Sequence, residues 1–214
     1  MAVASRRVYQ VHRDRQRESI VDAAEQLFLQ YGIESVSMAD IATAAEVTRA
    51  TLYKYFPNKE EVAWGVFERY CELGVESDRP PPNPALNGYQ RVEYIVRSWQ
   101  HNFVRYPNMM LYFAQFDVLY AKQGAAERMN AFKWRLHHGE EPIVTAIRKG
   151  IRDGSLRADL NPELTGVMLH SVFMGLGRRL VVAQPTFQAE FGQTLTQVYE
   201  ATIQVVLHGL RAAP

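Results

Sequence analysis

The sequence predicts an all-α protein built from a short N-terminal helical domain and a longer C-terminal helical domain. Apolar residues recur at helical spacing along most of the chain, and no strand-like alternation persists. A proline-rich stretch at 77–87, SDRPPPNPALN, separates the two series of helices. Its prolines exclude a helix there and indicate a stiff, extended linker.

Length and composition limit the classes to which the chain can belong. Its 214 residues, 47% of them hydrophobic, suffice for one domain of ordinary size or for a small domain joined to a larger one. The formal net charge of +1 gives no overall attraction to nucleic acid, so a basic surface would have to be local. Cys71 is the only cysteine, which excludes an intrachain disulfide and a multi-thiolate metal site and fits a reducing, cytoplasmic location.

We expect neither a targeting segment nor a membrane partner. The N-terminal stretch MAVASRRVYQVHRDRQRE lacks the apolar core that signal peptides carry. The chain contains no run of about eighteen apolar residues, the length that a membrane span requires.

Four helices are predicted in the N-terminal domain, which we place at 16–76. The first has an apolar face on Ile20, Ala23, Ala24, Leu27 and Phe28 and ends at Gly32. The next three are expected at 38–44, 49–55 and 59 to about 76. Each of these begins at a capping residue, and the caps are Ser37, Thr48 and Asn58.

The second and third helices have the spacing of a helix-turn-helix, with the turn at 45–48. Leu52 and Phe56 are four residues apart and are expected to face inward. In a DNA-binding helix-turn-helix the second helix enters the major groove with its N-terminal residues at base edges. Arg49 lies at that end, and its planar guanidinium can donate twice to guanine O6 and N7.

Other polar side chains around this helix suit contact with the DNA backbone. Ser37 and Thr48 lie at helix N-termini, where backbone N–H groups favour a phosphate. Hydroxyl and ammonium donors for phosphate oxygens are supplied by Tyr53, Tyr55 and Lys59. The alternative, in which the tyrosines only pack a small helical bundle and the basic residues are solvated, stays open.

The segments IVDAAEQLFLQYG at 20–32 and SMADIATAAEVTRATLYKYFPNKEEV at 37–62 resemble the TetR (tetracycline-repressor) family of bacterial regulators. The resemblance implies an all-α homodimer with an N-terminal three-helix DNA-binding domain and a C-terminal ligand-binding and dimerisation domain, here 88–214. It implies a transcription regulator, usually a repressor and not an enzyme, which binds a palindromic DNA operator and a small-molecule effector. It assigns base reading to Arg49, Ala50 and Thr51, backbone contact to Tyr53, Tyr55 and Lys59, and phosphate-contacting caps to Ser37 and Thr48.

The turn of the helix-turn-helix departs from the family pattern at one position. Glu46 stands where the family usually has glycine. If this residue adopts the left-handed conformation, glutamate costs about 1–2 kcal/mol relative to glycine.

The first fifteen residues form a basic N-terminal arm. From residue 6 to residue 17 the chain carries five arginines against Asp14 as the single acidic residue. A flexible basic arm can enter a minor groove next to the main DNA contact. A solubilising tail is the alternative.

Aromatic residues gather in the helices predicted at 88–106 and 108–122 and in the helix after them. Because the resemblance implies an effector site in this domain, we interpret them as the lining of a cavity, with an ordinary core as the alternative. The predicted ligand-binding residues are Trp99, His101, Phe103, Tyr112, Phe113, Phe116, Asp117 and Trp134. A neutral lipophile and a cationic amphiphile beside Asp117 are both allowed.

The last two predicted helices each carry an apolar face that indicates a dimer interface of four helices. On the first, the residues are Leu164, Val167, Met168, Ser171, Val172 and Gly175, with Gly166 and Gly175 small enough for close approach. On the second, they are Phe191, Leu195, Val198, Thr202, Val205 and Gly209.

No residues point to catalysis, a metal or a cofactor. His137 and Glu141 have the spacing of a metal pair, but Gly139 and Pro142 disfavour a rigid helix and no third ligand is near in sequence. The histidines form no Ser/His/Asp or Cys/His grouping, and no glycine-rich phosphate loop is present. Two other functions remain possible, an effector-independent DNA-binding protein and an enzyme that uses the helical cavity.

Overall fold

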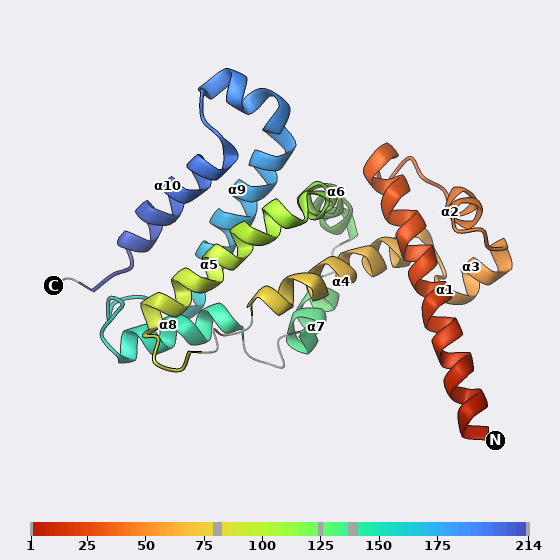
Figure 1. Cartoon of the computed structure of the whole chain (residues 1–214), viewed down its shortest axis with the longest axis horizontal. Helices are drawn as coiled ribbons and strands as arrows, with labels where there is room; N and C mark the ends of the chain where they lie inside the picture. The colour runs from red at the N-terminus through yellow and green to blue at the C-terminus, as the bar shows by residue number, and fades with distance from the viewer. Residues whose placement is uncertain (1, 79–82, 124–125, 137–140, 213–214) are drawn as a thin grey trace. The chain divides into compact units, whose positions relative to one another are not determined.

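The computed structural model describes residues 2–78, 83–123, 126–136 and 141–212, and within these ranges it is helical, without strands. The predicted all-α fold class is therefore confirmed (Figure 1). The helices are α1 (Ala2–Tyr31), α2 (Met38–Ala44), α3 (Arg49–Tyr55), α4 (Lys59–Asp78), α5 (Gly88–Arg105), α6 (Pro107–Gln123), α7 (Ala126–Leu136), α8 (Pro142–Arg152), α9 (Pro162–Phe191) and α10 (Leu195–His208).

The helices are divided between two compact units. The first unit contains residues 1–71 together with Tyr112–Gln123, and the second contains Glu72–Leu111 and residues 124–214. The helices α4 and α6 therefore each carry residues of both units. The sequence places the boundary between the domains at the proline-rich stretch 77–87. The division in the structure differs, because the C-terminal part of α6 belongs to the unit that contains the helix-turn-helix.

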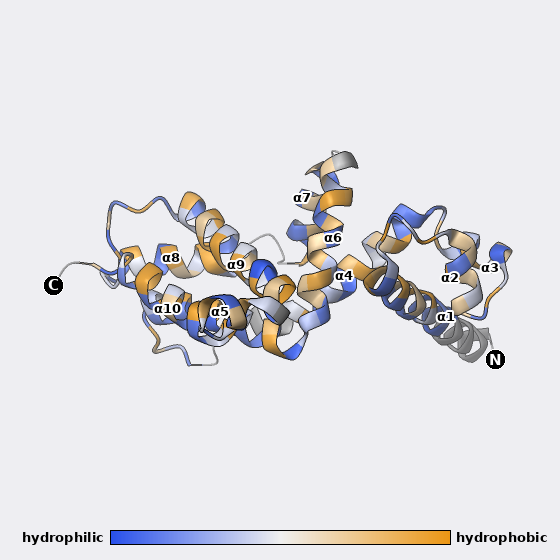
Figure 2. Ribbon diagram, turned by 90° about the horizontal axis from the view of Figure 1, so that it is seen from above, coloured by the Kyte–Doolittle hydropathy of each residue, from blue (hydrophilic) through white to orange (hydrophobic). Residues whose placement is uncertain are grey.

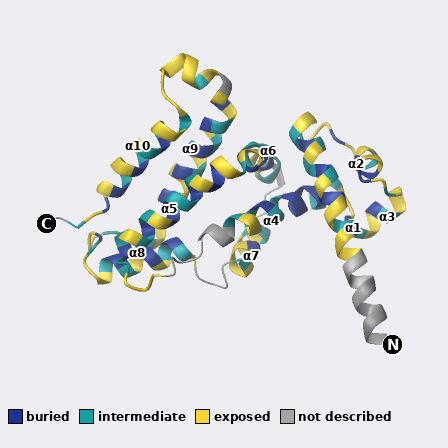
Figure 3. Ribbon diagram, in the orientation of Figure 1, coloured by how far each residue is buried: buried dark blue, intermediate teal, exposed yellow. Residues whose placement is uncertain are grey.

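The core of the first unit begins on the apolar face of α1. Ile20, Val21, Ala24 and Phe28 on this face are fully buried, and α1 packs against α2, which in turn packs against α3 (Figure 3). The helix begins at Ala2, so residues 2–15 are helical here and not the flexible arm that the sequence suggests. No glycine or proline interrupts residues 2–31, and the arginines and glutamines among them favour a helix.

The second half of this core is an aromatic cluster on α4 and the C-terminal part of α6. The ring of Phe116 stacks on Phe67 with centroids 4.3 Å apart and meets Trp64 edge-on at 5.0 Å. The hydroxyl of Tyr112 donates to the Ala63 carbonyl oxygen at 2.6 Å, and burial raises the pKa of that hydroxyl far above its ordinary value. Aromatic side chains that bury this much area hold α6 to the first unit.

The second unit is built by α5, α8, α9 and α10, with α5 in contact with each of the other three. Asn87 opens α5 with a capping box that includes Gln90. The helix then passes α8 so closely that a Cβ atom added at Gly88 would lie 1.9 Å from the Gly150 nitrogen. Only glycine fits there, so this crossing depends on Gly88.

The helices α9 and α10 are joined by a short connection. Gly192, with a φ of 66°, ends α9, and Thr194 opens α10 with a capping box (Figure 1). In the described part of the chain, Pro162–Gln184 of α9 is long and apolar enough to cross a membrane, by length and composition alone (Figure 2). Core helices of soluble proteins pass the same test, and Arg178 and Arg179 interrupt this apolar run.

Candidate nucleic-acid interface

The helix-turn-helix consists of α2, a tight turn and α3, and both helices have the predicted caps. The Ser37 hydroxyl oxygen accepts a hydrogen bond from the Asp40 backbone N–H at 3.2 Å, and the Asp40 carboxylate accepts one from the Ser37 N–H at 2.9 Å. The hydrogen bonds from the Ser37 side chain and backbone lower the pKa of Asp40 below its ordinary value. Thr48 caps α3 by accepting from the Thr51 N–H at 3.1 Å.

The turn between these helices is a Schellman motif. The Val47 N–H donates to the Ala42 carbonyl at 3.0 Å, and the Glu46 N–H donates to the Thr43 carbonyl at 3.2 Å. Glu46 has a φ of +53°, the only positive value at a described non-glycine residue. The left-handed conformation anticipated for this position is therefore present, with glutamate in the place that glycine usually fills.

The two faces of α3 differ sharply. Leu52 and the following Phe56 are buried, and the Arg17 guanidinium lies 5.3 Å from the centre of the Phe56 ring. Arg49 and Tyr53 face solvent as the sequence predicts, with Tyr53 52% exposed. These residues are four positions apart, so they lie on one side of the helix.

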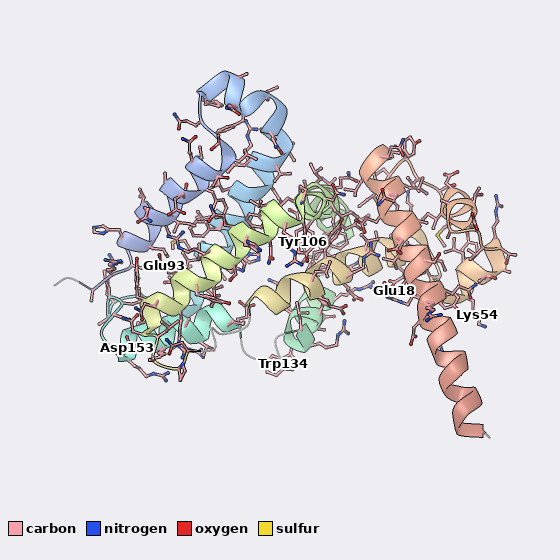
Figure 4. All side chains as sticks on the ribbon, viewed as in Figure 1. Glu18, Lys54, Glu93, Tyr106, Trp134 and Asp153 are labelled. Carbon is pink, nitrogen blue, oxygen red and sulfur yellow. The ribbon has the colours of Figure 1, made fainter. Side chains whose placement is uncertain are left out.

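Lys54 also lies on the exposed side of α3 and is absent from the residues predicted from sequence (Figure 4). Ala50, Tyr53 and Lys54 follow the i, i+3, i+4 spacing of one helical face, and all three are exposed. That spacing is the signal that could have identified Lys54. The exposed face of α3 thus consists of Arg49, Ala50, Tyr53 and Lys54.

Two predicted DNA contacts have partners within the first unit. The Tyr55 hydroxyl donates to Gln16 Oε1 at 2.9 Å, and the Lys59 ammonium donates to the Glu34 carbonyl at 2.8 Å. Both side chains are half-buried, and Thr51 is half-buried as well. The bonds tie α3 and the start of α4 to α1 and to the segment after it. An ammonium has two further N–H donors and a phenol oxygen can still accept, so both groups can form further hydrogen bonds.

The basic arm contributes two described arginines to the surface of α1. Arg13 and Arg15 are exposed, whereas Arg17 is half-buried beside Phe56. These positions are part of a helix that is continuous with the packed face of the first unit. Their charges are therefore carried by the same helix that packs in the first unit.

Four of the eight predicted ligand-binding residues lie in the first unit. Tyr112, Phe113 and Phe116 pack against aromatic rings of α1 and α4, with Phe113 5.3 Å from Phe67. Asp117 is exposed. Tyr112 and Phe116 therefore belong to the core of the unit that contains the helix-turn-helix, and none of these four residues lines the cavity described below.

The other four lie in the second unit and are also dispersed. Trp99 is buried and its ring lies 6.5 Å from Phe173 of α9. His101 is exposed on α5, and Trp134 on α7 is 70% exposed (Figure 4). Phe103 alone among the predicted residues lines the cavity of this unit. Aromatic periodicity identifies buried faces, but it does not show which neighbour each face meets.

The cavity lies between the end of α5, the C-terminal half of α9 and the start of α10. It has a volume of about 420 Å³, within the range of small-molecule sites. Its lining residues are Gln100, Phe103, Val104, Pro107, Gly177, Leu180, Val181, Gln184, Phe187, Gln188, Gln193, Thr194, Leu195, Thr196 and Tyr199.

The described residues contain no group of three or more His, Cys, Asp or Glu side chains that could hold a metal ion. Two members of the histidine motif considered above, His137 and His138, lie outside the described residues.

Comparison with known proteins bears on the same part of the chain. The family model described as "Bacterial regulatory proteins, tetR family" matches residues 20–63, which contain the helix-turn-helix. The A-factor receptor protein of Streptomyces griseus is 32% identical over 80 residues, which are 37% of this chain and 29% of that protein.

Two further similarities extend over most of the chain. The HTH-type transcriptional repressor DhaR of Mycobacterium sp. (strain GP1) is 24% identical over 195 residues, 87% of this chain and 92% of that protein. The crystal structure of a putative tetR family transcription regulator from Shewanella sp. PV-4 superposes with a TM-score of 0.68 at 20% identity, covering 92% of this chain and 99% of the other. At this identity the structural likeness shows the fold alone.

Proposed function

We propose a function from one premise, which is that the chain belongs to the tetR family of bacterial regulatory proteins and is a DNA-binding transcriptional regulator. On this premise, it is a homodimeric repressor that leaves its operator when a small lipophilic effector binds. A protein that acts on bacterial DNA works in the cytoplasm, which fits a chain whose only cysteine is Cys71.

The observation that carries this proposal is the exposed face of α3. This face presents Arg49 at the N-terminal end of the helix and Tyr53 and Lys54 one turn later. A guanidinium at that end suits two hydrogen bonds to guanine in the major groove, and the phenol and the ammonium suit phosphate oxygens. The caps Ser37 and Thr48 lie at helix N-termini that favour phosphate.

Homodimerisation is supported by exposed apolar side chains along the α9–α10 pair, which include Val182 and Phe191 in the C-terminal half of α9 at 54% and 53% exposed. Leu164 and Val167 near the start of α9 are more than half exposed, and Val205 near the end of α10 is 75% exposed. Exposed apolar groups gathered in this way mark interaction surfaces. Of the small residues expected to allow close approach, Gly175 is open, whereas a Cβ atom at Gly166 would meet Val144 at 2.9 Å within the chain.

A dimer explains how two α3 helices would read one operator. Two-fold symmetry presents a recognition helix to each half of a palindrome, about 34–36 Å apart along the DNA. An effector would act by binding more tightly to a form of the dimer that does not match this spacing. The name of the A-factor receptor protein, one of the relatives, also fits a ligand-binding regulator.

The proposal is tested by selecting bound fragments from random genomic DNA with the full-length protein and titrating the selected site. Arg49→Ala should weaken binding roughly 5- to 150-fold and relax preference at one base pair in each half-site. Arg152→Ala is the matched control, because it removes an equal charge from an exposed position on α8. Equal losses for the two variants, or no selected site, would refute DNA reading by α3.

A further inference from the structure

The cavity between α5, α9 and α10 has a lining suited to one class of ligand. Its walls combine apolar side chains, among them Phe103, Leu180 and Phe187, with the amides of four glutamines and the hydroxyls of two threonines. No lining residue carries a charge. An ionic group placed among the buried lining residues Phe103, Leu180 and Tyr199 would lose its hydration without gaining a counter-charge from the lining, which is costly. The lining therefore favours an uncharged molecule.

Four charged residues are adjacent in sequence to residues that line the cavity, namely Arg105, Arg178, Arg179 and Glu200, and none of the four lines it. Glu200 follows Tyr199 but is held by Arg97, whose guanidinium donates to both of its carboxylate oxygens at 2.8 and 3.1 Å. Arg178 lies between the lining residues Gly177 and Leu180 and donates from Nε to the Met174 carbonyl. Neither residue lines the cavity.

Tyr199 supplies an unsatisfied hydrogen-bonding group at this cavity. It lines the cavity, is 3% exposed, and its hydroxyl has no hydrogen-bond partner among the described residues. The ring is fixed between Phe103, 5.5 Å away and edge-on, and Phe173, 5.4 Å away. Burial raises the pKa of this hydroxyl far above its ordinary value, so it stays protonated and can donate.

A buried hydroxyl without a partner costs free energy, and buried polar groups are normally paired. A ligand oxygen is the kind of group that would satisfy it. We propose that this cavity is the effector site and that it takes an uncharged, mostly apolar molecule whose oxygen accepts a hydrogen bond from Tyr199. This inference rests on the proposed function in one respect only, namely that the bound molecule is the effector.

The charge of the ligand is tested with three probes that share one chain, 1-decanol, decanoate and decylammonium. Decanol is used below its aqueous solubility, and the two ions below their micelle concentrations, at pH 7 to displace Nile red, an uncharged apolar dye, from the full-length protein without DNA. Decanol should displace the dye at concentrations at least about tenfold lower than either ion, because each ion would be buried without a partner. Equal displacement by decanoate or decylammonium, or no saturable binding of decanol, overturns the proposed class.

The role of Tyr199 is tested with Tyr199→Phe, which removes the hydroxyl and keeps the ring. Its dissociation constant for decanol should rise about five- to tenfold, the loss of one hydrogen bond. Its melting temperature without ligand should be unchanged or higher, because an unsatisfied buried group has been removed. A lower melting temperature with unchanged decanol affinity would show that the hydroxyl is structural and would refute this role.

The location is tested by filling the cavity. Val181→Trp places a large ring at a half-buried lining residue and should abolish binding of Nile red and decanol. Val182→Trp is the matched control, since Val182 is exposed and does not line the cavity. If Val181→Trp does not fold, Thr196→Trp at an exposed lining position replaces it. Decanol binding that survives filling places the site elsewhere.

The same variants separate this inference from the proposed function, because ligand binding is measured without DNA. If the wild-type protein binds decanol but selects no operator, the proposal that it is a repressor is refuted, whereas the proposal that the cavity binds an uncharged ligand stands. If wild type and Val181→Trp both bind the operator and release it at the same decanol concentration, the proposal of a repressor stands. The proposal that the cavity is its effector site is then refuted.

Discussion

Replacing Glu46 by glycine should stabilise the protein. Glu46 is the C′ residue of the Schellman motif between α2 and α3 and has a φ of +53°. The left-handed region costs an L-residue about 1–2 kcal/mol, which glycine avoids. Glycine gives back about 0.4–1 kcal/mol because it makes the unfolded chain more flexible. Glu46→Gly should therefore raise the free energy of unfolding by about 0.5–1 kcal/mol.

The assay is urea unfolding followed by circular dichroism, with every variant at the same protomer concentration because dimer stability depends on it. The midpoint should rise while the slope stays constant, which indicates a change in stability without a change in the surface exposed. Glu46→Gln is the matched control, since it removes the charge and keeps a side chain in the left-handed region. We expect no increase in stability for it.

Each outcome has a distinct meaning. Stabilisation by glutamine equal to that by glycine would show that charge, and not the backbone, limits the stability of the turn. Destabilisation by glycine would refute the argument from left-handed strain. DNA binding gives a second reading, because Glu46 is exposed beside the cap of α3. Both variants remove a negative charge there, so both should bind any DNA more tightly than wild type at low salt.

Three further predictions concern charge. Lys54→Ala should reduce the steepness of the salt dependence of DNA binding by about one and leave stability unchanged, whereas Lys59→Ala should also lower stability, because it loses its bond to the Glu34 carbonyl; salt titrations and urea unfolding separate the two effects. Deleting residues 2–13 should weaken operator binding and leave the melting temperature within a few degrees, because the packed face of α1 begins at Ile20; equal affinity would return the arm to a solvated role. Asp153→Ala should cost about 1–3 kcal/mol of stability at pH 7, since the carboxylate accepts from the Gly88 N–H at 2.9 Å and from Ser155. Although burial opposes ionisation, these hydrogen bonds and the one from Lys149 hold the pKa of Asp153 well below its ordinary value, so the difference should begin to decrease as the pH falls below about 4 and should continue to decrease towards pH 2. A constant difference down to pH 2 would contradict this prediction.

The helix-turn-helix could be predicted from sequence because its signals are local. A cap such as Thr48 is recognised from its own side chain and the N–H three residues on, and the structure shows that bond. The inward face of α3 follows from the spacing of Leu52 and Phe56. The left-handed conformation of Glu46 could be anticipated because the family usually has glycine at this position of the turn.

The partners of the aromatic residues could not be predicted because they are set by tertiary packing. Helical spacing marks Phe116 as buried, and it is, but nothing near it in sequence indicates that Trp64 and Phe67 cover it. Tyr55 and Lys59 form hydrogen bonds with residues 39 and 25 positions away in sequence, so local sequence patterns could not predict these bonds. Tyr199 was overlooked for the same reason, since its neighbours come from α5 and α9.

The proposed effector cavity and the proposed dimer face share the helices α9 and α10, which predicts that ligand binding and dimerisation are coupled. The cavity involves the end of α9 and the start of α10, whereas Val167 and Val205 lie nearer the other ends of these helices. Coupling between two binding events is reciprocal, so the factor by which decanol changes the dimer dissociation constant must equal the factor by which dimerisation changes decanol affinity. Val205→Lys, at a 75% exposed position, should give a folded monomer for the second measurement. A ligand with a hundredfold preference for one form shifts the equilibrium by at most about 2.7 kcal/mol per site. If the Val205→Lys monomer and the wild-type dimer bind decanol equally, the cavity and the dimer face are not coupled, and this prediction is wrong.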